Sequence, residues 1–319
     1  MKRLLFVAAL LIAALAPAVS HAQSLDAGVR LFEAKKYAEA KTFFSPFAGR
    51  NAEAAYYMGR IAMDENDDKA ADWFETATKM SPTSSLYFDW YGRALGNQAI
   101  HASKWKMPFI APKVRNAFER AVALDPDNLD AREYLIQYYL QAPGVVGGSK
   151  QKAREMALEI RKRNAYRGGL QVANVCAGEK DLPCVEREML ALKAVFPDSS
   201  VVYTELAAFY ASQKNFDKSF VILDERLKAK PDDMNATFAI GRTGALSGQN
   251  LDRAEKALKS YLASPPPVNP IPPANVHFRL GMVYDKEGKR DLARGEYTAA
   301  LRLNPKLNDA KKALDALGG

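Results

Sequence analysis

The feature that most constrains this fold is a small residue that returns along the chain in phase with a proline. Near the C-terminus, Gly281 is followed after twelve residues by Ala293, and Ala293 after twelve more by Pro305. Seven weaker copies of this spacing precede it, and six of the eight copies carry the proline in phase. Small residues let two antiparallel helices cross closely, and proline stops the second helix. The spacing therefore predicts an all-α chain of about eight helical hairpins.

The last copy also carries large residues at fixed places. It follows the pattern L-G-x2-Y…A-x3-F…P, with Leu280 before the glycine and with Tyr284 and Tyr297 at the two aromatic places. In this it resembles a tetratricopeptide repeat. The resemblance implies an α-α superhelix, the tetratricopeptide solenoid, over residues 23–319. An amphipathic helix within 306–319 is expected to cap its open end.

The N-terminus has the organisation of a secretory signal peptide. A positively charged segment at residues 1–3 is followed by an apolar run over residues 4–19 and by small residues before Ala22. That run is sixteen residues long, contains Pro17 and is shorter than the ~20 residues that span a bilayer. We expect residues 1–22 to be a signal peptide cleaved after Ala22, which predicts a periplasmic or secreted protein.

Charge and hydropathy exclude some partners. The formal charge of +8 at pH 7 is a mild excess for 319 residues and indicates no nucleic-acid partner. No segment after the leader reaches transmembrane length, so we expect no membrane span in the mature chain. A basic tract at 150–167 is expected on the outer face of a second helix, with weak contact to an anionic envelope surface as the alternative.

The third unit, residues 84–126, is enlarged by an apolar insertion at 96–112. Trp105, Met107 and Phe109 lie within it, which is unusually apolar for a connection, because connecting segments normally lie at the solvent-exposed surface. One interpretation is a lengthened first helix whose end folds back onto a neighbouring unit, since exposed apolar patches are rare. The other is a protruding loop that contacts a partner protein or a membrane surface.

Two further connections depart from the repeat. The glycine-rich loop at 144–150 lacks the spacing of a nucleotide-binding P-loop. We interpret it as a wide turn with Gly147 or Gly148 at positive φ and Ser149 capping the next helix, or as a weak anion-binding turn. Together with the enlarged third unit, this loop resembles a subgroup of exported bacterial repeat proteins. The proline-rich segment 264–274 either spaces the last unit from its neighbour or packs along it.

Cys176 and Cys184 lie on either side of the turn in the fifth unit. Antiparallel helices joined by a short turn bring such positions face to face, and in an oxidising compartment a disulfide is expected. Two buried thiols are the alternative. The spacing is not C-x-x-C, and no further His or Cys lies nearby to complete a zinc site.

The sequence favours a protein without enzymatic activity. After the leader only His101 and His277 remain, and they lie far apart in the sequence. No nucleophile elbow, H-E-x-x-H motif or clustered metal ligands occur. We therefore predict no catalytic residues, no metal and no cofactor.

A binding surface is expected where the first helices of the hairpins form a concave groove. In this architecture, residues three before and one after the small residue point into the groove. Arginine in three units indicates that it accepts anions, because guanidinium pairs with carboxylate. Aromatic residues would supply apolar anchors, although each single residue also fits a solvated inner face. The candidates are Tyr56, Arg60, Asp89, Arg93, Glu133, Gln137, Asn174, Phe238, Arg242, Phe278 and Met282.

Three functions are compatible with these features, in order of preference. The first is a protein- or peptide-binding scaffold that acts in the cell envelope through the concave groove. The second is an accessory subunit of an envelope secretion or polymer-export assembly, docking through residues 100–112. The third is an enzyme of unrecognised type.

Overall fold

The computed structural model describes residues 20–103, 105–267 and 270–318, with the side chains of residues 20–24 left out. All regular structure in these residues is helical, which confirms the predicted fold class. The helices are α1 (Ser20–Glu33), α2 (Tyr37–Ala48), α3 (Ala52–Asp64), α4 (Ala70–Met80), α5 (Ser85–His101), α6 (Met107–Leu124), α7 (Leu129–Gln141), the 3₁₀ turn η1 (Gly144–Val146), α8 (Lys150–Arg163), α9 (Ala165–Glu179), α10 (Leu182–Val195), α11 (Ser200–Ser212), α12 (Phe216–Ala229), α13 (Met234–Ser247), α14 (Leu251–Ala263), α15 (Pro273–Lys286), α16 (Arg290–Leu303) and α17 (Asn308–Leu317).

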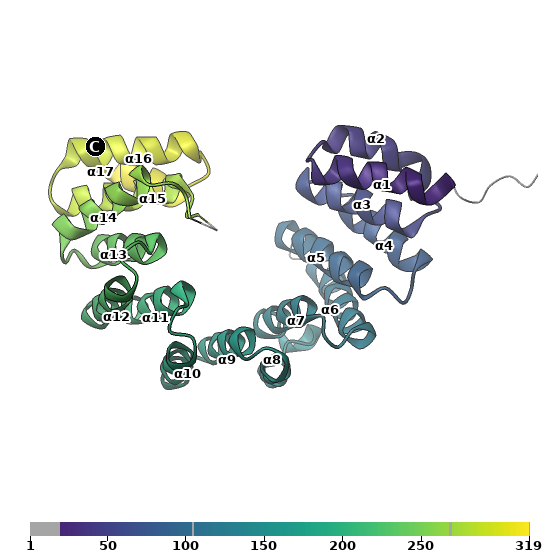
Figure 1. Ribbon diagram of the computed structural model, residues 1–319, viewed down its shortest axis with the longest axis horizontal. Coiled ribbons are helices and arrows are strands. Elements are labelled where there is room, and N and C mark those ends of the chain that lie inside the picture. Colours follow the sequence, from purple (N-terminus) through teal and green to yellow (C-terminus); the bar gives the residue numbers. More distant parts are fainter. Residues whose placement is uncertain (1–19, 104, 268–269, 319) are drawn as a thin grey trace, which may run out of the picture. The chain divides into compact units, whose positions relative to one another are not determined.

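Consecutive helices pair as antiparallel hairpins, from α1/α2 to α15/α16 (Figure 1). The expected capping helix is α17, whose Ala310 and Leu317 are buried. Leu317 joins the core cluster formed by α13 to α16. The described part of the chain is therefore an α-solenoid of eight hairpins with a helix on its last member.

The recurring glycine is explained by an aromatic ring of the second helix. In the last hairpin, a Cβ added at Gly281 would lie 2.5 Å from the Tyr297 ring, and in the second hairpin Gly59 faces Phe74 at 2.8 Å. No real Cβ comes so close, so only glycine lets these rings lie against the first helix. The buried residues at this place in the second helices are Phe44, Phe74, Phe118, Ala157, Met189, Leu223, Leu258 and Tyr297.

Turns between and within the hairpins are closed by N-cap side chains. Asp233, for example, follows the Lys230-Pro231 stop, and its carboxylate accepts the Ala236 N–H of α13. Such a cap satisfies one of the free N–H groups at a helix start. The residues that cap in this way are Asn51, Ser84, Asn128, Ser149, Asn164, Asp181, Ser199, Asn215 and Asp233.

The chain divides into two compact units, with the boundary between Met156 and Ala157 inside α8. Unit 1 contains α1 to α7, η1 and the start of α8. Unit 2 contains the rest of α8 and α9 to α17. The face formed by the first helices of a unit's hairpins is called the inner face of that unit.

The expected signal peptide and the proline-rich connection are each described only in part. Residues 1–19 of the expected signal peptide lie outside the described residues, and the expected cleavage after Ala22 falls in the first turn of α1. Of the proline-rich connection, residues 268–269 also lie outside. The Ile271 N–H donates to the Tyr261 hydroxyl at 2.7 Å, so this part of the connection lies against α14. No helix in the described part combines the length and hydrophobicity that crossing a bilayer requires.

Candidate functional site

Unit 1 has an apolar cavity of about 860 Å³ on its inner face. We call it the inner cavity. Stripes of residues at helical spacing on α5, α6 and α7 line it, together with η1 and the end of α3. Ala111, Val114 and Phe118 of α6 are buried beneath it, and the side-chain amides of Gln137 and Gln141 are exposed at its edge. The cavity can take apolar side chains while the amides bond to a peptide backbone.

The inner cavity arises from the enlarged third hairpin. With 17 and 18 residues, α5 and α6 are the longest helices that the structure describes. They cross where Gly92 meets Phe118, and a Cβ at Gly92 would lie 2.7 Å from that ring. One turn later, a Cβ at Gly96 would meet nothing within 4 Å, although Gly96 lines the cavity. The open space therefore begins beyond the crossing point.

A ladder of alternating cations and rings lies beside the cavity. The Arg60 guanidinium lies 3.8 Å from the centre of a Trp90 ring, and Arg93 lies 4.8 Å from Trp90 and 4.7 Å from Tyr134. Tyr134 stacks on Phe118 at 5.1 Å with the planes 8° apart. Such cation–π contacts contribute about 0.5–2 kcal/mol each. They hold Trp90 of α5 and Tyr134 of α7, two of the rings that line the cavity.

The arginines of this ladder already have partners within unit 1. Arg93 Nη2 donates to Asp89 at 2.6 Å and to Asp130 at 3.1 Å, and Arg60 Nη1 donates to the Tyr56 hydroxyl at 2.6 Å. Asp89 is 3% exposed, and burial raises the pKa of its carboxyl while Arg93 acts against that rise. The guanidinium groups of these two arginines therefore stabilise the inner face through contacts within unit 1, and they do not form a vacant anion site.

The remaining candidates of unit 1 differ in accessibility. Tyr56 is buried beneath the ladder. Gln137 lies exposed at the edge of the inner cavity, and Glu133 is half-buried on the preceding turn of α7. Of the predicted groove residues in this unit, Arg93 and Gln137 line the cavity. Its other main walls, including Trp90 and Tyr134, lie outside the two predicted columns.

In unit 2 the predicted residues do not converge on one hollow. Phe238 is buried against Tyr261, and Asn174 is exposed on α9. Phe278 and Met282 are half-buried on α15. Arg60 and Arg93 thus belong to the site in unit 1, whereas Arg242 belongs to unit 2, and the three do not form one anion site within a unit.

Arg242 has a neighbour that the sequence analysis missed. Arg279 of α15 is half-buried, and burial lowers the pKa of both guanidinium groups; Arg242 lowers that of Arg279 further. Among the described ion pairs within 4 Å neither arginine takes part. Arg242 instead donates to the Thr204 carbonyl at 3.5 Å and Arg279 to the Met282 sulfur at 3.1 Å. This pair can accept a carboxylate. Arg279 was missed because it lies one position outside the predicted column.

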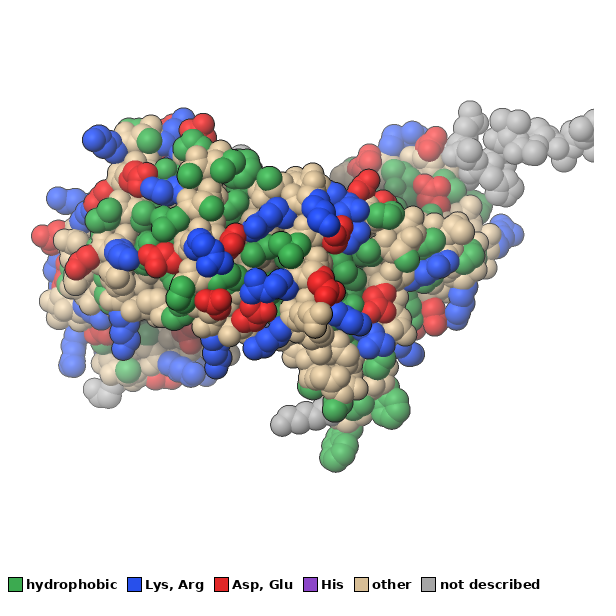
Figure 2. All heavy atoms as spheres, turned by 90° about the horizontal axis from the view of Figure 1, so that it is seen from below, with side chains coloured by type: hydrophobic (Ala, Val, Ile, Leu, Met, Phe, Trp, Pro, Cys, Tyr) green, Lys and Arg blue, Asp and Glu red, His purple; other side chains and the backbone are tan. Residues whose placement is uncertain are grey.

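The connection between α5 and α6 protrudes instead of folding back. Trp105 is 87% exposed, Phe109 76% and Ile100 80%, and Met107 is at the edge of the inner cavity. In Figure 2 the lobe that carries this connection ends in hydrophobic side chains. The expectation of a tail packed on a neighbouring unit is therefore wrong for these residues. The added length lies in α5 and α6, and the short connection between them stays exposed together with the helix ends beside it.

The glycine-rich loop approaches the same edge. It forms η1, Gly147 adopts φ +99°, and Ser149 caps α8. The Val146 carbonyl accepts hydrogen bonds from Tyr138 at 2.6 Å and from Arg115 at 3.3 Å. These bonds hold η1 on α6 and α7, so Val145, 94% exposed, faces water beside the cavity.

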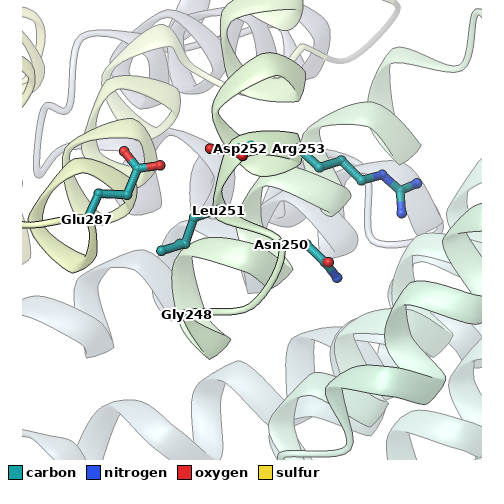
Figure 3. A pocket seen from close by; sticks show the side chains of 6 residues that line it. All are labelled: Gly248, Asn250, Leu251, Asp252, Arg253 and Glu287. Carbon is teal, nitrogen blue, oxygen red and sulfur yellow. The ribbon is translucent and has the colours of Figure 1, made fainter.

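In unit 2, Cys176 and Cys184 form a disulfide across the α9–α10 turn. A smaller hollow of about 440 Å³ lies at the α13–α14 turn (Figure 3). Of its three charged lining residues, Arg253 pairs with Asp224 and Glu287 with Lys289, and Asp252 is in no described ion pair. In the described ranges, no three His, Cys, Asp or Glu residues gather as metal ligands.

The fold defines a helical-hairpin solenoid, and the comparisons agree. Residues 274–307 match the family described as tetratricopeptide repeat. The fold is similar to a tetratricopeptide repeat protein from Parabacteroides merdae, with TM-score 0.55, 14% identity and coverage of 85% of this chain and 100% of that one. It is also similar to a monomeric mutant of IFIT1 with m7Gppp-AAAA, with TM-score 0.53, 15% identity and coverage of 94% and 72%. A search of curated proteins finds no match.

The family match therefore identifies one tetratricopeptide repeat, in residues 274–307. Residues 274–307 carry the sequence pattern of the family, and the hairpins carry its fold. At 14–15% identity, the likeness to the solved structures concerns the fold alone. The repeat is generally that of a non-catalytic scaffold for protein interactions.

Proposed function

We propose that this protein is a non-enzymatic scaffold that binds a protein or peptide partner through the inner cavity of unit 1. The observation that carries the proposal is a cavity of about 860 Å³ with apolar walls and exposed amides at its edge. An extended peptide could place one or two apolar side chains in it and bond its backbone to Gln137 and Gln141. Preformed rings around the cavity reduce the ordering that binding requires.

The site of action in this proposal is the cell envelope, after export and removal of residues 1–22. It is supported by the organisation of the N-terminal sequence, a positive start followed by an apolar run and small residues. The same export would expose Cys176 and Cys184 to an oxidising compartment.

Gly96 provides a direct test because its replacement reaches the cavity without disturbing the core. A leucine at this position extends into open space, since nothing lies within 4 Å of its Cβ. Gly295 on α16 of unit 2 is the matched control, because it too is helical and has no neighbours within 4 Å of its Cβ; it is exposed, whereas Gly96 is half-buried. Both substitutions remove a helix-interior glycine and should raise helix stability by up to about 1 kcal/mol.

The assay is selection of binding peptides from a random library, followed by titration calorimetry of the selected peptides. Peptides selected by the native protein should share an apolar residue. Gly96→Leu should weaken their binding at least tenfold, and Gly295→Leu should change it less than twofold. Equal binding by both variants would refute the cavity as the binding site.

Arginine variants are less suitable probes here. Removal of Arg93 would leave the Asp89 carboxylate buried without its counterion, so lost binding could reflect a damaged fold. Substitution at Gly96 avoids this difficulty. Docking to an export assembly through residues 100–112 is not adopted as the function, because we assign the exposed connection a different contact in the next subsection.

A further inference from the structure

The most exposed hydrophobic surface that the structure describes is at one edge of unit 1. We call Ile100, Trp105, Phe109 and Val145 the apolar tip. Their exposed fractions, from 76% to 94%, exceed those of every other large hydrophobic side chain described. Ile100 and Val145 both border the inner cavity, and Trp105 and Phe109 lie on either side of Met107, another residue of that border. Clustered exposure of this kind marks a contact surface.

The two chain segments that form the apolar tip carry positive charge alone, although Gln98 of one of them donates to the Asp68 carbonyl of the acidic α3–α4 turn. The two segments that form it contain no Asp or Glu over residues 90–118 and 134–154. Lys106, Lys113 and Lys150 are exposed there, and none of them takes part in a described ion pair. Unpaired lysines beside an apolar surface complement a partner that is negative at its surface and apolar beneath it.

The tip is also held in place before it meets a partner. Phe109 belongs to the first turn of α6, which begins at Met107 with Pro108 in its first turn. On the other side, hydrogen bonds from Tyr138 and Arg115 to the Val146 carbonyl fix η1. Contact therefore needs little ordering of the backbone, which lowers its entropic cost.

We propose that the apolar tip binds the surface of a membrane that contains anionic lipids. Trp105 and Phe109 enter the interfacial region, where tryptophan is preferred, and the surrounding lysines contact the headgroup phosphates. The lobe projects from the surface (Figure 2), and a projecting apolar end suits a soft interface, whereas a rigid protein partner must supply a matching hollow. This contact is independent of the partner proposed for the inner cavity.

The experiment is flotation of the processed protein with vesicles of phosphatidylcholine alone or with 30% phosphatidylglycerol. The test variant is Trp105→Ser/Phe109→Ser. The control is Leu292→Ser/Leu303→Ser, which removes two hydrophobic residues of α16 that are 52% and 57% exposed. All variants share one N-terminus, so any contribution from it cancels.

The native protein and the control should bind the anionic vesicles, and the tip variant should bind at least tenfold more weakly. Binding should fall as the phosphatidylglycerol content is lowered and at high salt. In the native protein, vesicle binding should shift the tryptophan fluorescence to the blue as Trp105 enters the interface. Trp105→Phe should retain vesicle binding but lose this shift, because Trp73 and Trp90 are partly covered by protein. Gly96→Leu should bind vesicles like the native protein, which separates this contact from the inner cavity.

Two results would overturn the proposal. One is the absence of vesicle binding at every lipid composition, including the case in which the tip variant loses a protein partner instead. The other is equal vesicle binding by the tip variant and its control.

Discussion

Replacement of Asp233 by alanine tests how unit 2 joins successive hairpins. The Asp233 carboxylate accepts a hydrogen bond from Arg226 Nε at 2.7 Å, from the Ser200 hydroxyl at 2.8 Å and from the Ala236 N–H at 3.0 Å. The side chains of Arg226 and Asp233 are only 7% and 5% exposed. One carboxylate thus connects α11, α12 and the start of α13 away from water.

The expected loss is set by the charge that remains after the substitution. Asp233→Ala leaves the Arg226 guanidinium buried without its counterion, and breaking a buried pair in this way costs about 3–5 kcal/mol. Asp232 is the matched control, because it is in the same turn but 77% exposed and lies 3.6 Å from Lys230. Its replacement by alanine should cost less than about 1 kcal/mol.

The assay is urea unfolding followed by circular dichroism at 222 nm at pH 7. A double variant, Arg226→Met/Asp233→Ala, should recover part of the loss because no buried charge then remains unpaired. Equal losses for Asp232→Ala and Asp233→Ala, or no recovery in the double variant, would refute the reasoning.

Three further predictions use the same unfolding assay. Burial by itself raises the pKa of the Asp233 carboxyl, but its hydrogen bonds together hold the pKa below the usual value, so its stabilisation is complete above the unfolded-state pKa of about 3.9. The difference between native protein and Asp233→Ala should therefore shrink as the pH falls below about 4 through the folded-state pKa. Gly281→Ala should destabilise by about 1–3 kcal/mol because its Cβ meets a tyrosine ring, whereas Gly295→Ala should stabilise by up to about 1 kcal/mol. Reduction of the Cys176–Cys184 disulfide should cost about 2.5 kcal/mol, and an unchanged midpoint would contradict this.

The candidate site was only partly predictable from the sequence. The sequence singled out the insertion at 96–112, but whether it folds back depends on how much surface the next hairpin offers. Trp90 and Tyr134 were missed because the rule for the groove selects two positions of each first helix. Further positions line the inner cavity because α5 and α6 continue past the Gly92–Phe118 crossing.

By itself the sequence determined the helical hairpins, their approximate limits and the capping helix at Asn308–Leu317. These features depend on spacing within a single unit, where a glycine admits a ring and a proline stops a helix. Only the tertiary structure decided the partners of the inner residues. Arg93 meets Asp130, which lies 37 residues away on the next hairpin, and Arg279 lies beside Arg242 on the preceding one. Such pairs depend on the rotation between neighbouring hairpins, which the spacing within each hairpin does not specify.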